Sequence, residues 1–171
     1  MKKILCICLC SCMLFLCGCK KIIKEDCPET SRLFTSALEV DCGDGVFVSG
    51  NITRLGAESW RVEMSSPETI EGIVLLYSPD GIIAEYHGMT FTTAKENTPE
   101  KNILGSVFKC IDHSSTLVSM PYEEMENGRI FFGECDKGKY TITTDNDDNI
   151  TAVCLEDMGL SATLEDFCVI E

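Results

Sequence analysis

Apolar and polar residues alternate in short runs along most of the chain, and turn dipeptides such as Asp80-Gly81 and Asn127-Gly128 separate the runs. A period of two places successive side chains on opposite faces, which is typical of antiparallel strands joined by tight hairpins. In the segment 59–65, Trp60, Val62 and Met64 share one face and charged residues take the other. We predict about nine strands, at 33–42, 46–54, 59–65, 73–78, 82–92, 129–135, 139–145, 149–156 and 161–170.

One segment has helical spacing instead. Thr98 suits a helix cap, and Pro99 suits the first helical position, where its missing N–H costs nothing. Apolar residues then recur at helical intervals, at Ile103, Leu104, Val107, Phe108 and Ile111. We predict an amphipathic helix that packs its apolar face on the sheet, with Lys109 and Asp112 off that face.

Two weaker helical candidates are a single turn at 67–71 and a segment at 29–38. The economical fold is α+β, a hairpin-rich sheet with one or two helices covering one face.

Length and charge narrow the classes of protein. The 171 residues are enough for one domain with a sizeable core. Fourteen basic residues stand against 28 acidic ones, for a formal net charge of −14. A surface this acidic repels phosphate backbones, so we expect no nucleic-acid partner.

The first residues predict export. Lys2 and Lys3 precede an apolar run over 4–17, which matches a secretory signal and is too short to cross a bilayer. The segment Leu16-Cys17-Gly18-Cys19 resembles the lipobox of bacterial lipoproteins, with an unusual cysteine at position 17. That resemblance implies removal of residues 1–18 and attachment of diacylglycerol to Cys19.

The rest of the chain then divides into an anchor and a domain. Residues 19–30 are polar and mixed in charge, and we interpret them as the lipidated anchor with a short tether. Residues 31–171 form the folded domain. An acylated cysteine holds a protein at the membrane surface, so we expect it on the extracytoplasmic face of a bacterial cell membrane.

Six cysteines remain after the signal segment and Cys19: Cys27, Cys42, Cys110, Cys135, Cys154 and Cys168. An exported domain with six cysteines permits three disulfides in fifteen arrangements, and the sequence cannot choose among them. No C-x-x-C spacing occurs, which argues against a zinc ribbon or a thioredoxin-type site. Two interpretations stay open, at least one disulfide or small buried apolar side chains.

The order of motifs is similar to that of a known group. Ser66-Pro67-Glu68, the Asp80-Gly81 hairpin and the segment Tyr86-His87-Gly88-Met89 resemble the pattern of small bacterial lipoproteins of the LolA/LppX-like lipoprotein-carrier superfamily. The resemblance implies a strongly bent antiparallel half-barrel, closed by helices over an apolar cavity that holds acyl chains. We find no arginine that matches a functional residue of the carriers.

The candidate cavity positions are the inward residues of the predicted strands and helix. They are Val48, Ile52, Trp60, Val62, Met64, Leu75, Tyr77, Met89, Phe91, Val107, Phe108 and Ile111, with Val46 as a further inward position. Such stripes also occur in filled cores, so two functions stay open. One is a carrier of a lipid or lipidated ligand, and the other is a non-catalytic module with a filled core that docks an envelope or spore-coat protein.

Other chemistry is weakly represented. Neither His87 nor His113 lies in a metal-ligand spacing or beside a nucleophile motif, so we expect no enzyme, no metal and no cofactor. The acidic run at 145–149 resembles a calcium loop, but Ile150 occupies the position where that loop needs glycine. We therefore predict an acidic hairpin turn there.

Overall fold

Twelve antiparallel strands, rather than about nine, form one continuous sheet in the computed structural model, which describes residues 24–43, 45–99 and 102–170. The strands are β1 (Lys24–Asp26), β2 (Phe34–Asp41), β3 (Phe47–Gly56), β4 (Ser59–Ser66), β5 (Val74–Ser78), β6 (Gly81–Tyr86), β7 (Met89–Ala94), β8 (Met120–Met125), β9 (Gly128–Cys135), β10 (Gly138–Thr144), β11 (Ile150–Leu155) and β12 (Leu160–Val169). Their order in the sheet is β1-β8-β9-β10-β11-β12-β2-β3-β4-β5-β6-β7, so β1 and β7 are its edges.

The additional strands have local causes. The predicted strand over 82–92 is two strands, because His87 and Gly88 both adopt positive φ, 48° and 80°. Two successive residues with positive φ match the type I′ turn that joins tight hairpins. Tyr86 and Met89 pair directly across this turn. The polar stretch at 120–125 is β8, and tether residues Lys24–Asp26 pair with it as β1.

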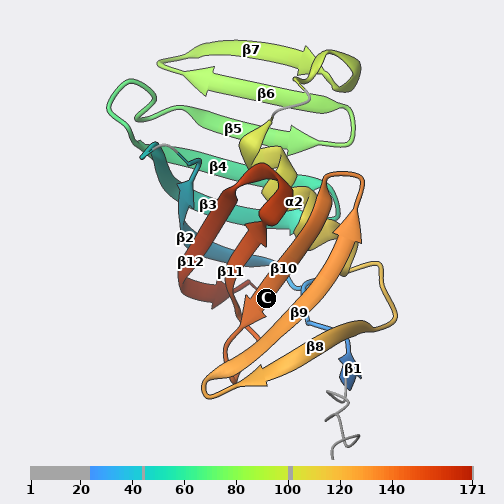
Figure 1. The fold of residues 1–171 in the computed structure, drawn as a ribbon. Coiled ribbons are helices and arrows are strands. Elements are labelled where there is room, and N and C mark those ends of the chain that lie inside the picture. Colours follow the sequence, from blue (N-terminus) through green and yellow to red (C-terminus); the bar gives the residue numbers. More distant parts are fainter. Residues whose placement is uncertain (1–23, 44, 100–101, 171) are drawn as a thin grey trace, which may run out of the picture.

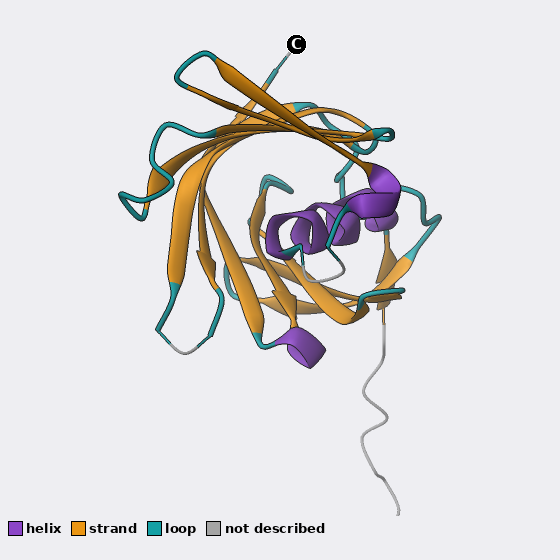
Figure 2. Cartoon of the chain, turned by 90° about the horizontal axis from the view of Figure 1, so that it is seen from above, coloured by secondary structure: helices purple, strands orange, loops and turns teal. Residues whose placement is uncertain are grey.

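The sheet is strongly bent, and one helix, α2 (Ile103–Ser114), lies inside the bend. Figure 2 shows the strands curving around this helix. Short 3-10 turns occur at Lys95–Asn97 and Glu156–Met158. The α+β class, the curved sheet and the helix on its concave face are therefore confirmed, with one α-helix in the described chain.

The helix begins later than Thr98-Pro99 predicted. Asn102 is the N-cap, and its side-chain oxygen accepts a hydrogen bond from the Gly105 N–H at 3.0 Å. Thr98 instead ends the preceding 3-10 turn. Asparagine is among the strongest N-cap residues, because its oxygen satisfies an N–H that has no partner within the helix.

The two weaker helical candidates are not helices. Residues 67–72 form turns between β4 and β5, and the segment from Phe34 onward is strand β2. The acidic run at 145–149 is the predicted hairpin turn, in which the Asp145 carboxylate accepts hydrogen bonds from the N–H groups of Asp147 and Asn149. Within the described ranges, no group of side chains has a metal-binding arrangement.

Some predictions fall outside the described residues. The signal segment 1–18, the lipidation site Cys19 and the start of the tether lie there. Among the helices of the described chain, none combines the length and the apolar character that crossing a bilayer requires.

Candidate ligand site on the concave face

The strand register defines which side chains share the concave face. Residues directly opposite each other in antiparallel strands point to the same side. Trp60 pairs with Tyr77 and Val62 pairs with Leu75, so the inward face of β4 continues into β5. The same face continues through β6 into β7, where Phe91 pairs with Ala84. One apolar face thus runs from beneath α2 to the edge of the sheet.

The part of this face beneath α2 is filled by side chains. Phe108 of α2 stacks on Trp60 with ring centroids 4.5 Å apart and planes 8° apart. Tyr77 meets Phe108 edge-on at 5.2 Å, and Phe34 meets Trp60 edge-on at 5.8 Å. Ile52, Val62, Val107 and Ile111 are fully buried around these rings. The space between helix and sheet is therefore a packed core.

Two surface hollows, of about 320 and 390 Å³, lie elsewhere. The first is lined by Phe132, Gly133, Glu134, Lys139, Tyr140, Thr141 and Glu156. The second is lined by Gly72, Val74, Glu85, Tyr86, His87, Gly88, Met89 and Thr90. Both are wide open to solvent, and neither includes a residue of α2. Neither hollow is therefore the closed cavity that was expected beneath the helix.

A buried polar cluster joins α2 to the sheet. The Arg54 guanidinium donates to Asp112 Oδ1 at 2.9 Å, and the Trp60 indole N–H donates to Asp112 Oδ2 at 2.8 Å. Arg54 also donates to the Ser31 carbonyl at 2.7 Å. Arg54 is only 2% exposed. Asp112 therefore faces the sheet, contrary to the prediction that it lies off the packed face of the helix.

Polar contacts also hold both ends of α2. The Tyr77 hydroxyl donates to Oδ1 of Asn102, the N-cap of α2, at 3.2 Å. Burial raises the pKa of Tyr77 to about 12, although this hydrogen bond opposes the shift, so the hydroxyl is protonated at neutral pH. Near the other end, His113 Nδ1 lies 2.7 Å from the Tyr140 hydroxyl. Ser114 donates to Thr30 Oγ1 at 2.8 Å, and both residues are buried.

An arginine lies over two aromatic rings near the β1 end of the sheet. Arg129 pairs with Asp26 and Asp148, and its guanidinium lies 5.5 Å from the centre of the Tyr122 ring and 5.2 Å from that of Phe131. Cation–π contacts and two carboxylates together fix this side chain.

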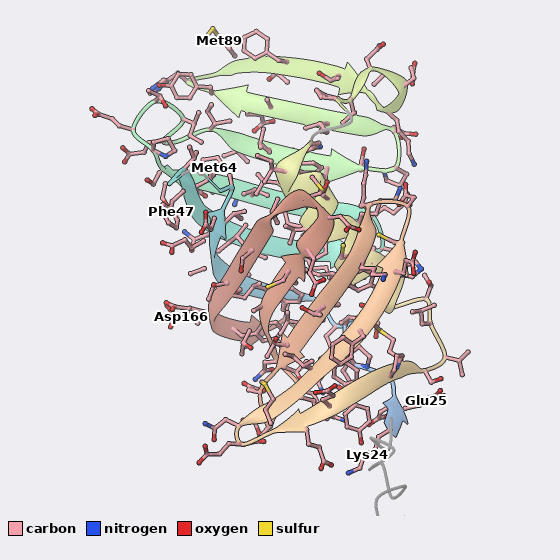
Figure 3. The ribbon with its side chains drawn as sticks, in the orientation of Figure 1. Lys24, Glu25, Phe47, Met64, Met89 and Asp166 are labelled. Carbon is pink, nitrogen blue, oxygen red and sulfur yellow. The ribbon has the colours of Figure 1, made fainter. Side chains whose placement is uncertain are left out.

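The concave face is open at the β7 end. We call the apolar and aromatic inward side chains of β5, β6 and β7 the open shelf: Leu75, Tyr77, Ile82, Ala84, Tyr86, Met89 and Phe91. Leu75, Tyr77, Ile82 and Ala84 are half-buried, but Tyr86 is 37% exposed, Met89 52% and Phe91 61%. Figure 3 places Met89 at the outer margin of the sheet. Large apolar side chains gathered on one exposed face are typical of binding surfaces.

The predicted cavity residues divide between these two regions. Ile52, Trp60, Val62, Met64, Val107, Phe108 and Ile111 are buried beneath α2, and Val48 packs half-buried against that core. Met89 and Phe91 lie on the exposed part of the open shelf, and Leu75 and Tyr77 lie at its inner margin, where they pack half-buried against the core. Met89 and Phe91 have the predicted inward phase but are not enclosed, because α2 does not reach β7. Val46 is 54% exposed and precedes β3, so its placement in the interior is wrong.

The sequence reasoning missed Arg54 and Asp112 as a pair. A signal was present, because Arg54 is two residues after the inward Ile52 and Asp112 is four residues after Phe108. Those spacings place both charged side chains on the packed faces of their elements. Two opposite charges on facing surfaces predict a buried ion pair.

Comparison with known proteins supports the fold alone. No protein family matches the sequence, and no curated protein does. Among solved structures, an uncharacterized conserved protein from Thermus thermophilus is similar, with 10% identity, a TM-score of 0.50 and coverage of 82% of this chain and 80% of that one. A LolA superfamily protein from Nitrosomonas europaea is similar with 9% identity, a TM-score of 0.41 and coverage of 82% and 87%.

Proposed function

We propose that the protein is a non-catalytic lipoprotein, anchored through Cys19 to the extracytoplasmic face of a bacterial membrane, that binds an acyl chain on its concave face. The ligand is a lipid or a lipidated molecule, and the role is that of a carrier in envelope biogenesis. The observation that carries this proposal is the continuity of the apolar face. It runs from the packed core to Phe91 and Met89, where nothing in the described chain covers it.

The open shelf offers a starting point for such a ligand. An acyl chain lying along Leu75, Met89 and Phe91 removes its own apolar surface and theirs from water. Each buried methylene contributes about 0.8 kcal/mol. Deeper binding requires α2 to move, because Phe108 occupies the space over Trp60. We therefore propose shallow binding on the shelf and a second, deeper position in place of α2.

The anchor orients the shelf. Five residue steps separate Cys19 from Lys24, the first residue of β1. An extended chain of that length reaches at most about 18 Å, which holds the β1 edge near the membrane surface. The shelf lies at the opposite edge of the sheet. A ligand bound there is presented away from the anchoring membrane, which suits transfer to a partner.

Native mass spectrometry tests the ligand. The full chain, which includes Cys19, is extracted from membranes. It is compared with Phe91→Asp and Thr92→Asp variants prepared in the same way. Thr92 is the matched control, because it neighbours Phe91 on β7 and pairs with Ile83, so strand alternation directs its side chain to the convex face. We expect bound lipid on the wild type and the control, and loss of it on Phe91→Asp. Bare protein in all three samples contradicts the proposal.

A second candidate function is a protein-interaction module of the envelope or spore coat. The packed core beneath α2 favours it, because a filled interior leaves no room for a ligand there. In this case the shelf and the acidic surface bind a basic protein partner. Copurification of one protein in amounts equal to the chain, together with absence of lipid, selects this function. Loss of that partner from Phe91→Asp but not from Thr92→Asp places it on the shelf.

A further inference from the structure

Two cysteines face each other where α2 packs on β9. Cys110 is fully buried on the helix. Cys135 ends β9 and is four residues after the inward Phe131, so strand alternation directs its side chain to the concave face as well. Cys135 packs against the buried core cluster that contains Cys110, and burial together with the nearby Cys135 thiol raises the pKa of the Cys110 thiol. The Lys137 N–H donates to Cys135 Sγ at 3.4 Å, which helps to fix that sulfur.

The residues around this pair hold the two elements in register. Lys109 Nζ lies 2.5 Å from Asp136 Oδ2, so the residue before Cys110 is tied to the residue after Cys135. One turn further along α2, His113 is bound to Tyr140 of β10. The Lys109–Asp136 ion pair and the His113–Tyr140 contact therefore flank the cysteine pair and hold α2 against β9 and β10.

The other four thiols of the described domain have different partners. Cys27 donates to the Leu117 carbonyl at 3.3 Å, and Cys42 donates to the Val40 carbonyl at 3.9 Å. Cys154 lies 3.4 Å from the Ser161 hydroxyl, and Cys168 is exposed beside the Val169 carbonyl. All six cysteines of the described residues carry free thiols. Cys110 and Cys135 are the pair whose surroundings favour bond formation.

We propose that Cys110 and Cys135 form a disulfide that joins α2 covalently to β9 in the oxidised protein. The oxidant is a second disulfide, either of a small thiol or of an oxidoreductase. The Cys135 thiolate attacks it, which releases one thiol and forms a mixed disulfide. As the Cys110 sulfur attacks the Cys135 sulfur, the Cys110 proton passes to the departing thiolate, which leaves as the second thiol. Two protein thiols are oxidised, two protons leave them, and the oxidant disulfide is reduced to two thiols.

The order of these steps follows from the surroundings of each sulfur. Cys135 is partly accessible, so it reacts with the external disulfide first. Burial and the neighbouring Cys135 raise the pKa of the Cys110 thiol far above its usual range. A buried thiol of this kind reacts poorly with external reagents. Its attack on the adjacent mixed disulfide needs no external access, so Cys110 completes the bond.

The bond has a consequence that rests on the proposed function. While it is closed, α2 cannot leave the sheet, and an acyl ligand has access to the open shelf alone. Reduction releases the helix and makes the deeper position available. The oxidation state of one pair then selects between two binding depths.

Peptide mapping tests the disulfide directly. The full chain, purified in detergent, is incubated with glutathione disulfide or with dithiothreitol, blocked with N-ethylmaleimide while denaturing, and digested with trypsin. Cleavage after Lys109, Arg129 and Lys137 places Cys110 and Cys135 on separate peptides, 110–129 and 130–137, with one cysteine each. We expect these peptides to be linked after oxidation and separate after reduction. Maleimide on both, or linkage of either to another cysteine, overturns the proposal.

Variants distinguish this proposal from failure of the proposed function. Cys110→Ser removes the linked peptide, whereas Cys168→Ser, at an exposed thiol, retains it. Oxidation should raise the thermal midpoint of the wild type and of Cys168→Ser, but not that of Cys110→Ser. A fluorescent fatty acid is then titrated into oxidised and reduced protein, and we expect fewer binding sites in the oxidised form. If no fatty acid binds in either state, the acyl function fails while the peptide map still decides the disulfide.

Discussion

The two halves of the concave face differ in how much their inward side chains are exposed to solvent, although the strands of both halves show the same alternation of apolar and polar residues. Beneath α2, Trp60, Val62 and Ile52 are 0–1% exposed. On the open shelf, Met89 and Phe91 have the same inward phase but are more than half exposed. Alternation specifies which side of a sheet a residue occupies, and it says nothing about what lies on that side. An inward side chain is buried where α2 covers it and exposed where the sheet extends beyond α2.

The two edges of the sheet show a matching contrast. Strand β1 has three residues, Lys24, Glu25 and Asp26, all charged. Strand β7 has six residues, Met-Thr-Phe-Thr-Thr-Ala, with neither a charge nor a proline. Short charged edges discourage pairing with other chains, whereas long uncharged edges permit it. The open shelf therefore ends at the edge that is better suited to contact a partner.

The strongest test of this contrast places the same charge in both halves. Val62→Asp buries a carboxylate in an apolar part of the core, and we expect a loss of about 4 kcal/mol or more and no cooperative unfolding. Phe91→Asp places the same group on the open shelf and should change the free energy of unfolding by less than about 1 kcal/mol. Thermal unfolding followed by circular dichroism measures both. Similar losses from the two variants show that the shelf is covered in solution.

A second test removes the charge that joins α2 to the sheet. Asp112→Ala leaves Arg54 buried without its ion-pair partner, and we expect a loss of about 3–5 kcal/mol in urea unfolding. A double variant, Arg54→Met with Asp112→Ala, should recover part of that loss, because no unpaired charge remains. If Asp112→Ala costs less than about 1 kcal/mol, the helix is not held by this cluster and the packed half is less rigid than its burial indicates.

The smallest expected change in stability concerns the exposed ion pair between Lys109 of α2 and Asp136, the residue after β9. The hydrogen bond from Lys109 lowers the pKa of Asp136. A carboxyl with a lowered folded-state pKa contributes stability above its unfolded value of about 4, and this contribution disappears as the pH falls through the folded value. Both side chains are about half exposed, so Asp136→Asn should cost less than about 1 kcal/mol at about pH 7. Urea unfolding should show that the difference from wild type becomes smaller as the pH is lowered below about 4.

Much of the fold was predictable because local signals agreed. The strand containing Trp60, Val62 and Met64 was predicted to within one residue, since turn residues and alternation give the same boundaries. The hairpin at His87-Gly88 was missed because histidine is an uncommon first residue of a type I′ turn. The helix start was misplaced because Pro99 is a stronger signal in the sequence than Asn102, which became the cap through its hydrogen bond to Gly105.

The candidate site was predictable in phase but not in extent. Trp60 and Phe91 both have the inward phase that alternation predicted, yet one is buried and the other is open to solvent. Whether a position is core or open shelf depends on contacts with α2 that are distant in sequence. The same is true of the link between Arg54 and Asp112, 58 residues apart.

The sequence by itself determined the class of fold, the antiparallel pairing and the inward phase of the strands, because each depends on neighbours within a few residues. It also carries the predicted export and lipidation signals, which are linear motifs. Only the tertiary structure decided that the sheet stays open at β7, that α2 fills one half of the bend, and that Cys110 meets Cys135. Those features arise where one helix packs on strands that are distant from it in the sequence. No local pattern encodes how far along the sheet the helix extends.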